Sequence, residues 1–473
     1  MTQRPVDFAA LVGRLRATFA SGKTRPLEYR KRQLTRLSEM IRENEEALCD
    51  AVWKDLRRGK AETVAFETLY LQNEIQTALS ELDTWTRPQK VSRSLQQLLD
   101  AAFVQKEPLG LVLVLGAWNY PLQLPLLPLV SAIAAGNAAI VKPSEVTANC
   151  ASTVAQLLPK YLDEEAYAVV EGGVEESTEL LRQRFDHVFF TGGIAVGRAV
   201  MIAAAQHLTP VTLELGGKSP CFVDHNKVDM AVVAKRIAWG KFVNCGQTCI
   251  APDYVMVEEE GLGALVQALQ SAVLEFYGDD PQKSDDYSRF PAQRHFERVE
   301  KLLRETKAKV AHGGRTNASD RYIEPTLLVD VPRDDVVMKE EIFGPLLPVV
   351  TVENVDDAIS LIRSKEKPLT LYVFSNDNQV VSKVLDGTTS GNAVVNDTLL
   401  NMLCDGLPFG GVGQSGMGRY HGRAGFDTFS NSKSVLHRGL KFDSALWMRY
   451  PPFDANKLSW LKMLVTKRKL PFF

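Results

Sequence analysis

The stretch Leu109–Val141, LGLVLVLGAWNYPLQLPLLPLVSAIAAGNAAIV, is the most apolar part of the chain. Prolines and the polar Asn119 and Gln123 interrupt it, and a membrane-spanning helix tolerates such interruptions poorly. Its length instead fits a buried strand, a helix and a second strand. We therefore expect this stretch to form part of a buried α/β domain rather than a transmembrane helix.

The same alternation continues along the chain. Short runs rich in Val, Ile and Phe recur at 138–142, 168–172 and 187–192, with helical stretches around 147–158 and 175–184. Strands that are apolar along their whole length and alternate with helices are typical of a parallel sheet covered on both faces. A second alternation begins near 214–217 and extends to about 395, while residues 8–90 have the periodicity of charged amphipathic helices. The predicted fold class is α/β, with two such domains.

Composition excludes several classes of protein. The 473 residues are 45% hydrophobic and 24% charged with a formal net charge of -2, which is ordinary for a soluble globular protein and gives no electrostatic reason to expect a nucleic-acid partner. Six cysteines in so long a chain do not form a disulfide framework. Reduced thiols and the lack of a signal-peptide pattern favour a cytoplasmic protein.

Two motifs have features of a nucleotide site. Residues 189–205, FFTGGIAVGRAVMIAAA, read as a strand, a glycine turn and a helix, in which backbone N–H groups approach a phosphate at the helix start. Gly192 and Gly197 have neither P-loop nor G-x-G-x-x-G spacing, so a purely structural turn stays open. Lys142 and Glu145 follow the run at 138–142, where they would bind a ribose or form a solvated surface pair.

Four further positions carry side chains suited to catalysis. Asn119 in GAWNYP would donate its amide to a developing oxyanion or cap a turn. Glu214 in ELGGKSP would be a general base with a raised pKa or one half of a buried ion pair. Cys245 and Cys249 in NCGQTCIAP lack the spacing and nearby histidines of a zinc site, so no metal site is predicted there; a nucleophile or two buried thiols remain.

Taken in order, these motifs resemble the aldehyde dehydrogenase superfamily. GAWNYP, VKPSE, FTGG, ELGGKSP, GQTC, EEIFGP and LPFGGVGQSGMG follow one another along the chain. RIAWGKFVNCGQTCIAPDY (236–254), KEKPLTLY (365–372) and GMGRYHG (416–422) resemble its class 3 branch, which acts on fatty and aromatic aldehydes. The resemblance covers nearly the whole chain.

The resemblance implies a role for each motif. Cys249 would be the nucleophile, Glu214 the general base, and Asn119 the oxyanion donor together with the N–H of Cys249. The cofactor, NAD with NADP as the alternative, would bind Lys142 and Glu145 at the adenosine ribose. The implied dinucleotide turn comprises Thr191, Gly192, Gly193 and Gly197, and the implied grip on the nicotinamide ribose comprises Glu341 and Phe343.

The resemblance also implies the organisation of the chain. A Rossmann-like NAD(P)-binding domain would comprise 1–87 and 105–214, a catalytic domain 215–395, and a bridging sheet 88–104 and 396–440. This sheet would join two subunits in a homodimer. The remaining C-terminal tail would comprise 441–473.

Three points stay open. The segment KLSWLKMLVTKRKLPFF (457–473) has apolar residues flanked by lysines and arginine, which would touch a membrane surface or dock on protein. Phe290-Pro291-Ala292 departs from the class 3 pattern. A cofactor-independent thiol esterase using Cys249 is the alternative to oxidation of apolar aldehydes to acids, because hydrolysis of a thioester is half of the same chemistry.

Overall fold

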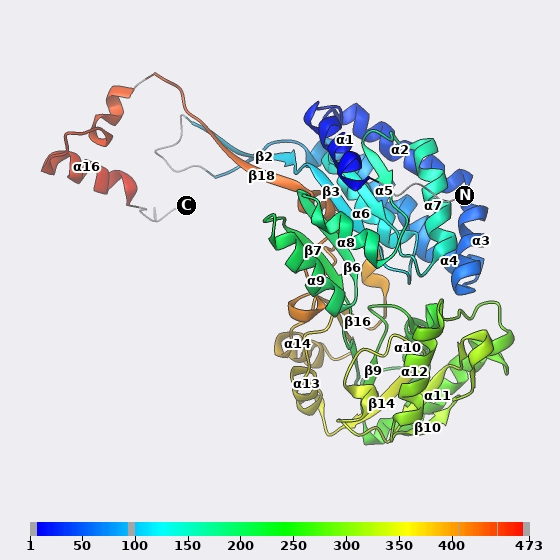
Figure 1. Ribbon diagram of the computed structural model, residues 1–473. Helices are drawn as coiled ribbons and strands as arrows, with labels where there is room; N and C mark the ends of the chain where they lie inside the picture. Colours follow the sequence, from blue (N-terminus) through cyan, green and yellow to red (C-terminus); the bar gives the residue numbers. More distant parts are fainter. Residues whose placement is uncertain (1–6, 93–99, 405, 442, 467–473) are drawn as a thin grey trace. The chain divides into compact units, whose positions relative to one another are not determined.

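The computed structural model describes residues 7–92, 100–404, 406–441 and 443–466. The chain divides into two compact units, one formed by 1–85 and 108–430 and the other by 86–107 and 431–473. The first unit contains two predominantly parallel sheets, each with its own helices (Figure 1). The predicted α/β class is confirmed.

The first sheet forms where the sequence is most apolar. Its strands, in spatial order, are β17 (Gly416–Met417), β7 (Val211–Leu215), β6 (His187–Gly192), β3 (Leu111–Leu115), β4 (Ala138–Lys142) and β5 (Tyr167–Val169). All neighbouring pairs are parallel except β17 with β7. The order reverses between β3 and β6, and ligands of such sheets bind at the carboxyl ends of the strands beside this reversal.

The stretch 109–141 forms the strand, helix and strand that its pattern predicts. α6 (Gln123–Ala135) connects β3 to β4, and every residue of all three elements is buried. α6 is therefore apolar on all sides, because other elements surround it. It packs against α2 (Leu27–Glu43) and α5 (Leu69–Trp85).

Helices cover this sheet on both faces. The amphipathic pattern predicted for 8–90 is confirmed as a series of helices as far as Trp85, with a π-helical turn, η1, between α4 and α5, whereas Gln89–Lys90 form a strand. The remaining helices of this part of the unit are α1 (Phe8–Ala20), α3 (Glu45–Leu56), α4 (Lys60–Thr63), η1 (Val64–Thr68), α7 (Ala148–Tyr161), α8 (Val174–Arg182), α9 (Ile194–Ala205) and α15 (Gly422–Thr428).

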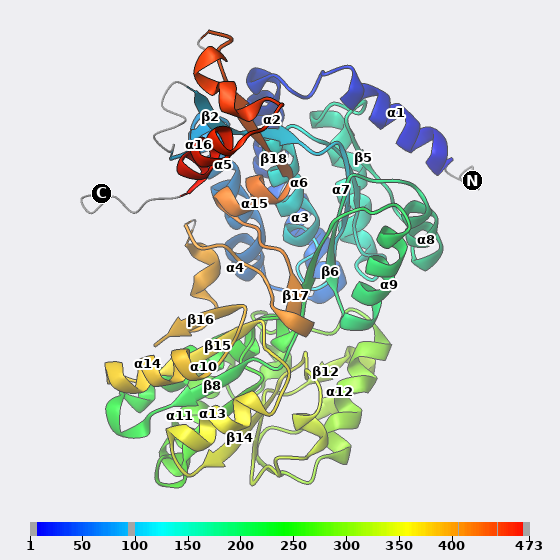
Figure 2. The same ribbon diagram turned by 90° about the vertical axis from the view of Figure 1, so that its left-hand side faces the viewer.

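The second sheet carries the second alternation. Its strands, in spatial order, are β10 (Lys309–His312), β13 (Thr326–Val329), β14 (Leu346–Val352), β9 (Tyr254–Glu258), β8 (Pro220–Val223), β15 (Thr370–Phe374) and β16 (Asn392–Val395). Only β10 is antiparallel to its neighbour. Its helices are α10 (Met230–Phe242), α11 (Glu259–Tyr277), α12 (Gln293–Glu305), α13 (Val355–Arg363) and α14 (Asn378–Gly387), shown with the sheet in Figure 2. β11 (Thr316–Asn317) and β12 (Tyr322–Ile323) form a separate antiparallel hairpin.

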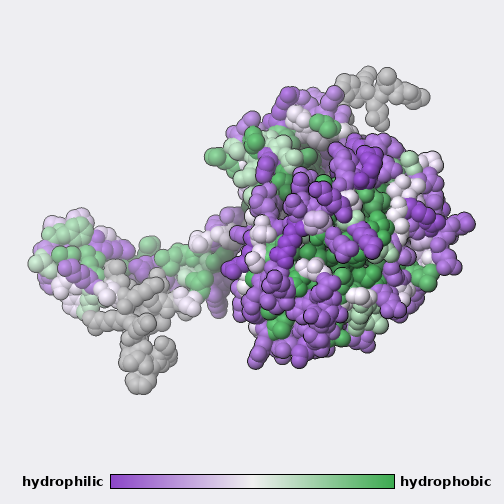
Figure 3. Space-filling model, turned by 90° about the horizontal axis from the view of Figure 1, so that it is seen from below, coloured by the Kyte–Doolittle hydropathy of each residue, from purple (hydrophilic) through white to green (hydrophobic). Residues whose placement is uncertain are grey.

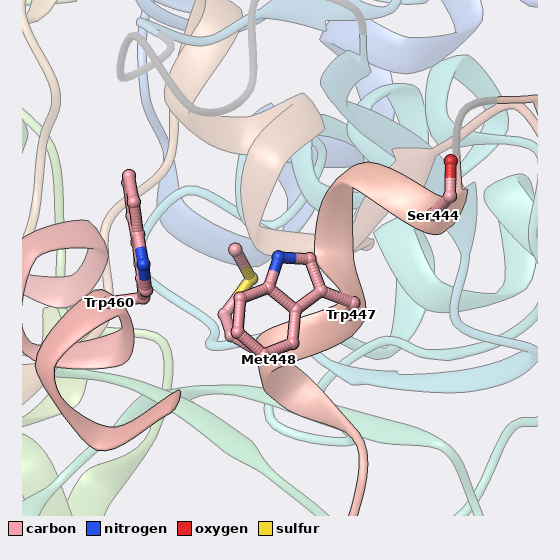
Figure 4. Close-up of a pocket in the computed structure, with 4 residues that line it drawn as sticks. All are labelled: Ser444, Trp447, Met448 and Trp460. Atoms are coloured by element: carbon pink, nitrogen blue, oxygen red, sulfur yellow. The ribbon is translucent and has the colours of Figure 1, made fainter. Parts of the chain in front are cut away.

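The second unit contains the small antiparallel sheet and the C-terminal segment. β1 (Gln89–Lys90), β2 (Ala101–Pro108) and β18 (Ser430–His437) pair in that order, with β18 at one edge. The C-terminal segment forms η10 (Asp443–Arg449) and α16 (Ala455–Val465). Ser444, Trp447, Met448 and Trp460 line a cavity of about 430 Å³ between them (Figure 4).

No described helix combines the length and the apolar composition needed to cross a bilayer. The face of the molecule seen in Figure 3 is mostly hydrophilic, with hydrophobic residues gathered in patches.

Candidate active site

The predicted site residues of the first sheet lie at the carboxyl ends of its strands. Asn119 follows β3, Lys142 ends β4, Thr191 and Gly192 end β6, and Glu214 is the fourth residue of β7. Because carboxyl ends of parallel strands meet at one edge, residues far apart in sequence come together there. Asn119 and Gly192 flank the point at which the strand order reverses.

The segment between α10 and Cys249 makes a left-handed turn. Asn244, Cys245 and Gly246 have φ angles of 51°, 55° and 73°. Cys245 is fully buried in the core of the second sheet, and its thiol donates to the Tyr287 hydroxyl over 3.5 Å. Cys249 is partly buried against the core of the first sheet. The two cysteines therefore have different surroundings.

The loop carrying Asn119 bonds directly to the loop carrying Cys249. The Asn119 side-chain nitrogen donates to the Gln247 carbonyl over 3.0 Å, and the Tyr120 hydroxyl lies 2.8 Å from the Thr248 hydroxyl. An amide nitrogen has two hydrogens, so the bond to Gln247 orients the group and leaves one donor for another acceptor.

Two carboxylates lie within electrostatic reach of Cys249. Neither oxygen of the buried Glu214 has a hydrogen-bond partner among the described residues, and burial raises its pKa well above the ordinary value. Burial, and then the charge of Asp253, raises the pKa of Glu341 to about 8, opposed by the Gly217 N–H. Any side chain at Gly216 would collide with the Glu341 carboxylate, which explains a glycine there.

The same surroundings disfavour a thiolate at rest. Burial raises the pKa of Cys249, and the charges of Glu341 and Glu214 raise it further. The backbone N–H groups of Cys249 and Ile250 act in the opposite direction. The thiol therefore loses its proton most readily when a nearby carboxylate accepts it.

The structure brings Lys142 and Glu145 together. The Lys142 ammonium lies 3.4 Å from a Glu145 carboxylate oxygen and donates to the Pro143 carbonyl over 3.1 Å. Lys142 is buried, and burial lowers its pKa, whereas Glu145 is partly exposed. The pair offers one donor and one acceptor beside each other, as a ribose diol requires.

The start of α9 fits a phosphate group. No side chain caps this helix, and the space beside Gly193 is open to 4 Å. The buried Thr191 hydroxyl has no partner among the described residues. Uncapped N–H groups at a helix start and an unpaired hydroxyl suit an anion.

The loop with Glu341 and Phe343 lies against the Asn119 loop. Phe343 has a left-handed φ of 48°, and its ring meets the Trp118 ring edge to face at a centroid distance of 5.3 Å. Trp118 also packs on His295 of α12, with centroids 4.5 Å apart. The Ile342 N–H donates to Asp253 over 3.1 Å, which anchors the loop to the second sheet.

The chain resembles known proteins over nearly its whole length. Residues 3–435 match the model of the family described as the aldehyde dehydrogenase family. This chain belongs to the aldehyde dehydrogenase family.

Individual relatives place it in the family 3 branch. The chain is 50% identical over 457 residues to aldehyde dehydrogenase family 3 member A2 of Rattus norvegicus, covering 97% of this chain and 94% of that protein. It is 49% identical over 448 residues to aldehyde dehydrogenase family 3 member B1 of Homo sapiens, covering 95% of each. A substrate-bound structure of Staphylococcus aureus AldH superposes with a TM-score of 0.94 at 40% identity, covering 98% of this chain and all of that one.

A structure with bound cofactor has the same fold. A Mycobacterium tuberculosis aldehyde dehydrogenase complexed with NAD+ superposes with a TM-score of 0.81 at 27% identity, covering 91% of this chain and 89% of that one. The family match and the family 3 relatives make this protein an NAD(P)-dependent aldehyde dehydrogenase.

The departure at Phe290-Pro291-Ala292 has a structural place in this aldehyde dehydrogenase. Phe290 is fully buried against Phe296, the Pro291 carbonyl accepts from Arg321, and Ala292 is the residue before α12. The segment thus sets the start of α12, which also carries His295.

Sequence patterns missed a set of charged residues, of which two are fully buried and one is partly buried. Arg58, Glu62 and Glu67 lie between the N-terminal helices and the loops of Asn119 and Cys249. In a helical sequence pattern, charged residues are predicted to form a solvent-exposed face. Only the burial seen in the structure distinguishes these residues from exposed ones. Among the described residues, His225, Glu258 and Glu260 bring metal-ligating atoms close together, and His225 Nδ1 lies 3.3 Å from a Glu258 carboxylate oxygen.

Proposed function

We propose that the enzyme oxidises apolar aldehydes to carboxylic acids with Cys249 as its nucleophile. The observation that carries this is the meeting of three groups: an oriented Asn119 amide, the Cys249 thiol and the partnerless Glu214 carboxylate. Each group is weak evidence alone, but together they supply a nucleophile, an oxyanion donor and a base.

The aldehyde carbon is attacked by the Cys249 sulfur after a carboxylate takes the thiol proton. The aldehyde oxygen becomes negative as the carbon–sulfur bond forms, and the free Asn119 amide hydrogen and the Cys249 N–H stabilise it. One such donor lowers the activation free energy by about 3–4 kcal/mol. When bound, NAD(P) accepts the hydride that leaves this carbon.

The thioester left on Cys249 is then hydrolysed. Glu214 takes a proton from the attacking water, the carbon–sulfur bond breaks and the acid is released with the thiol restored. A raised pKa makes Glu214 a stronger base than an ordinary carboxylate. Glu341, whose charge also reaches the sulfur, is placed to share the thiol's proton.

The cofactor's proposed binding groups lie at the carboxyl edge of the first sheet and in the loop of Glu341 and Phe343. Lys142 and Glu145 would hold the adenosine ribose. The turn from Thr191 to Gly197 and the start of α9 would hold the pyrophosphate, and Glu341 and Phe343 the nicotinamide ribose. We propose NAD as the preferred cofactor because the Glu145 carboxylate would accept from a 2′-hydroxyl and repel a 2′-phosphate. A mouse relative is named as dimeric and NADP-preferring, so NADP remains the alternative.

Aromatic residues near the reacting groups support an apolar substrate. Phe66, Trp118 and Trp239 are partly buried and pack on the same core as Cys249. The Phe66 ring lies 6.1 Å from that of Tyr120 and 5.8 Å from that of Trp239. A surface of this kind binds hydrocarbon better than polar chains.

The assembly and the location of the enzyme are part of the proposal. β18 is an edge strand of its sheet, and edge strands offer unpaired backbone groups to a second copy, which supports a homodimer. The exposed Leu458, Trp460 and Met463 of α16 accompany Lys457 and Lys462, which supports peripheral membrane contact by a cytoplasmic enzyme.

A panel of aldehydes of increasing chain length, assayed with NAD and NADP in parallel, tests the proposal. We expect kcat/KM to rise with chain length, to be higher with NAD, and to vanish in Cys249→Ser. The Cys245→Ala variant is the matched control. It should keep most of the activity, because the Cys245 thiol lies in a different core from that of Cys249. Turnover of activated esters without any aldehyde oxidation would instead favour the thiol esterase.

A further inference from the structure

A cluster of buried and partly buried charges lies behind the loops of Asn119 and Cys249. Arg58, between α3 and α4, is completely buried, and its guanidinium pairs with the completely buried Glu67 carboxylate of η1. Removing charges from water is costly, so an ion pair is weak evidence for stability by itself. The cluster must be understood from what else it contacts.

Arg58 and Glu67 hold the Asn119 loop from both ends. The Arg58 guanidinium donates to the Asn119 carbonyl over 3.0 Å and lies over the Tyr120 ring. One Glu67 oxygen accepts from the N–H groups of Leu122 and Gln123, at 2.6 and 2.9 Å. A π-helical turn, which is rare, supplies Glu67, and such turns recur at functional sites.

Glu62 holds the other loop. Its carboxylate accepts from the Asn244 N–H over 2.9 Å, and burial raises its pKa to about 7, opposed by Arg58 and by this N–H. Asn244 and Cys245 are non-glycine residues in the left-handed region, which L side chains disfavour. Such a turn persists only when its surroundings enforce it.

The two loops are also tied to each other. The Asn244 amide nitrogen donates to the Asn119 carbonyl over 2.8 Å and to the Gln247 carbonyl over 3.2 Å. The Asn119 carbonyl therefore receives donors from both Arg58 and Asn244. Arg58 thus contacts Asn119, which carries one oxyanion donor. Glu62 contacts Asn244, which precedes the other donor, Cys249.

We propose that Glu62 and Arg58 are positioning residues for aldehyde oxidation. They hold the Asn119 loop and the left-handed turn before Cys249 in the positions at which the Asn119 amide and the Cys249 N–H both point to the aldehyde oxygen. Neither residue touches substrate. The inference rests on the proposed function of Asn119 and Cys249, and it assigns the N-terminal helices a part in catalysis.

A double-mutant cycle between Glu62 and Asn119 tests this. Asn119→Ala should lower kcat roughly 10²–10³-fold, as loss of one oxyanion donor does. Glu62→Ala should lower kcat roughly tenfold or more while KM for NAD(P) changes little. Because Glu62 reaches Asn119 through the Asn244 side chain, Glu62→Ala should lower kcat by a much smaller factor in the Asn119→Ala background than in the unaltered enzyme. Multiplied effects in the double variant would overturn the proposal.

Conservative and control variants separate positioning from general stability. Glu62→Gln keeps an acceptor oxygen for Asn244 and should recover most of the kcat lost in Glu62→Ala. Asp55 is a buried carboxylate that accepts from the N–H groups of Asn149 and Cys150 at the start of α7. Asp55→Ala should lower Tm without lowering kcat per folded active site. Equal kcat losses in Glu62→Ala, Glu62→Gln and Asp55→Ala would contradict a positioning role.

A further variant covers the case in which Glu62→Ala does not fold. Asn244→Ala removes the link to Asn119 without leaving Arg58 short of a carboxylate, and it should lower kcat in the same direction. Unchanged kcat in Asn244→Ala would overturn the inference. A failure of the proposed function looks different, because Asn119→Ala would then keep full kcat or the unaltered enzyme would not oxidise aldehydes.

Discussion

Glu214 is a buried carboxylate and Glu341 a partly buried one, and the charges of both raise the pKa of Cys249. Glu214 has no hydrogen-bond partner among the described residues, whereas the Gly217 N–H binds Glu341 and Asp253 raises its pKa. A partnerless carboxylate is free to bind a water and take its proton. A carboxylate that is already bound is better suited to hold a ribose.

This difference predicts the phenotype of Glu214→Gln. The thioester should still form, giving a burst of about one NAD(P)H for each active site, while steady-state kcat falls roughly 10²–10⁴-fold because its hydrolysis lacks a base. Rapid-mixing absorbance at the wavelength of the reduced cofactor measures both phases. Loss of the burst together with turnover would contradict this assignment, since the base would then act before the thioester forms.

The pH dependence of the unaltered enzyme follows from the raised pKa of Glu214. Burial raises the pKa of Glu214, so the carboxyl is protonated and cannot act as a base at low pH. Hydrolysis of the thioester should therefore be slow in acid and become faster as pH rises, with its midpoint well above that of an ordinary carboxyl. Glu341→Gln matches Glu214→Gln in chemistry and is expected to raise KM for NAD(P) rather than abolish hydrolysis.

At the scale of elements, α9 links the cofactor turn to the sheet. Gly197 in this helix faces β7, and an added Cβ would lie 2.8 Å from a Leu215 methyl carbon, closer than carbon atoms pack. The helix can approach the sheet only because this residue has no side chain, and its uncapped start is thereby held beside Gly192.

Gly197→Val should therefore displace the start of α9. We expect KM or Kd for NAD(P) to increase roughly tenfold, with a smaller change in KM for the aldehyde and a loss of about 1–3 kcal/mol of stability from overpacking. Calorimetric titration with NAD and thermal unfolding measure the two effects. Ala199→Val, on the exposed side of the same helix, controls for the cost of a β-branched residue. Equal cofactor affinities in the two variants would show that the close approach is not needed.

The sequence predicts an element reliably when the hydrophobic pattern of that element directly reflects its burial. β3, α6 and β4 are buried on every side, so a continuous apolar run was sufficient to place them. The site motifs could be assigned because their order along the chain resembles one family. Arg58, Glu62 and Glu67 could not, because a charged residue on a helix reads as exposed unless its partners are known. The left-handed turn at Asn244 and Cys245 has no signal either, since cysteine rarely adopts it.

At the scale of the whole molecule, the C-terminal segment is the part whose purpose the active site does not explain. Trp447 and Met448 of η10 and Trp460 of α16 line their own cavity, while Leu458 and Met463 are about half exposed. Apolar side chains beside Lys457 and Lys462 are the composition of a helix that lies on an anionic membrane.

A truncation after Pro452 tests that role. The shortened enzyme should lose sedimentation with vesicles containing phosphatidylserine but keep kcat/KM for a short, water-soluble aldehyde. Lys457→Glu combined with Lys462→Glu in the full chain should weaken vesicle binding roughly tenfold or more, since each lysine near such a surface contributes about 1 kcal/mol and the glutamates also repel. Binding of the full chain should fall as salt is raised, because the attraction is screened.

Vesicle binding that is unchanged by truncation would instead mean that the segment docks on protein. A loss of dimer in the truncated enzyme, measured by size-exclusion chromatography with light scattering, would then identify the partner as a second copy of the chain.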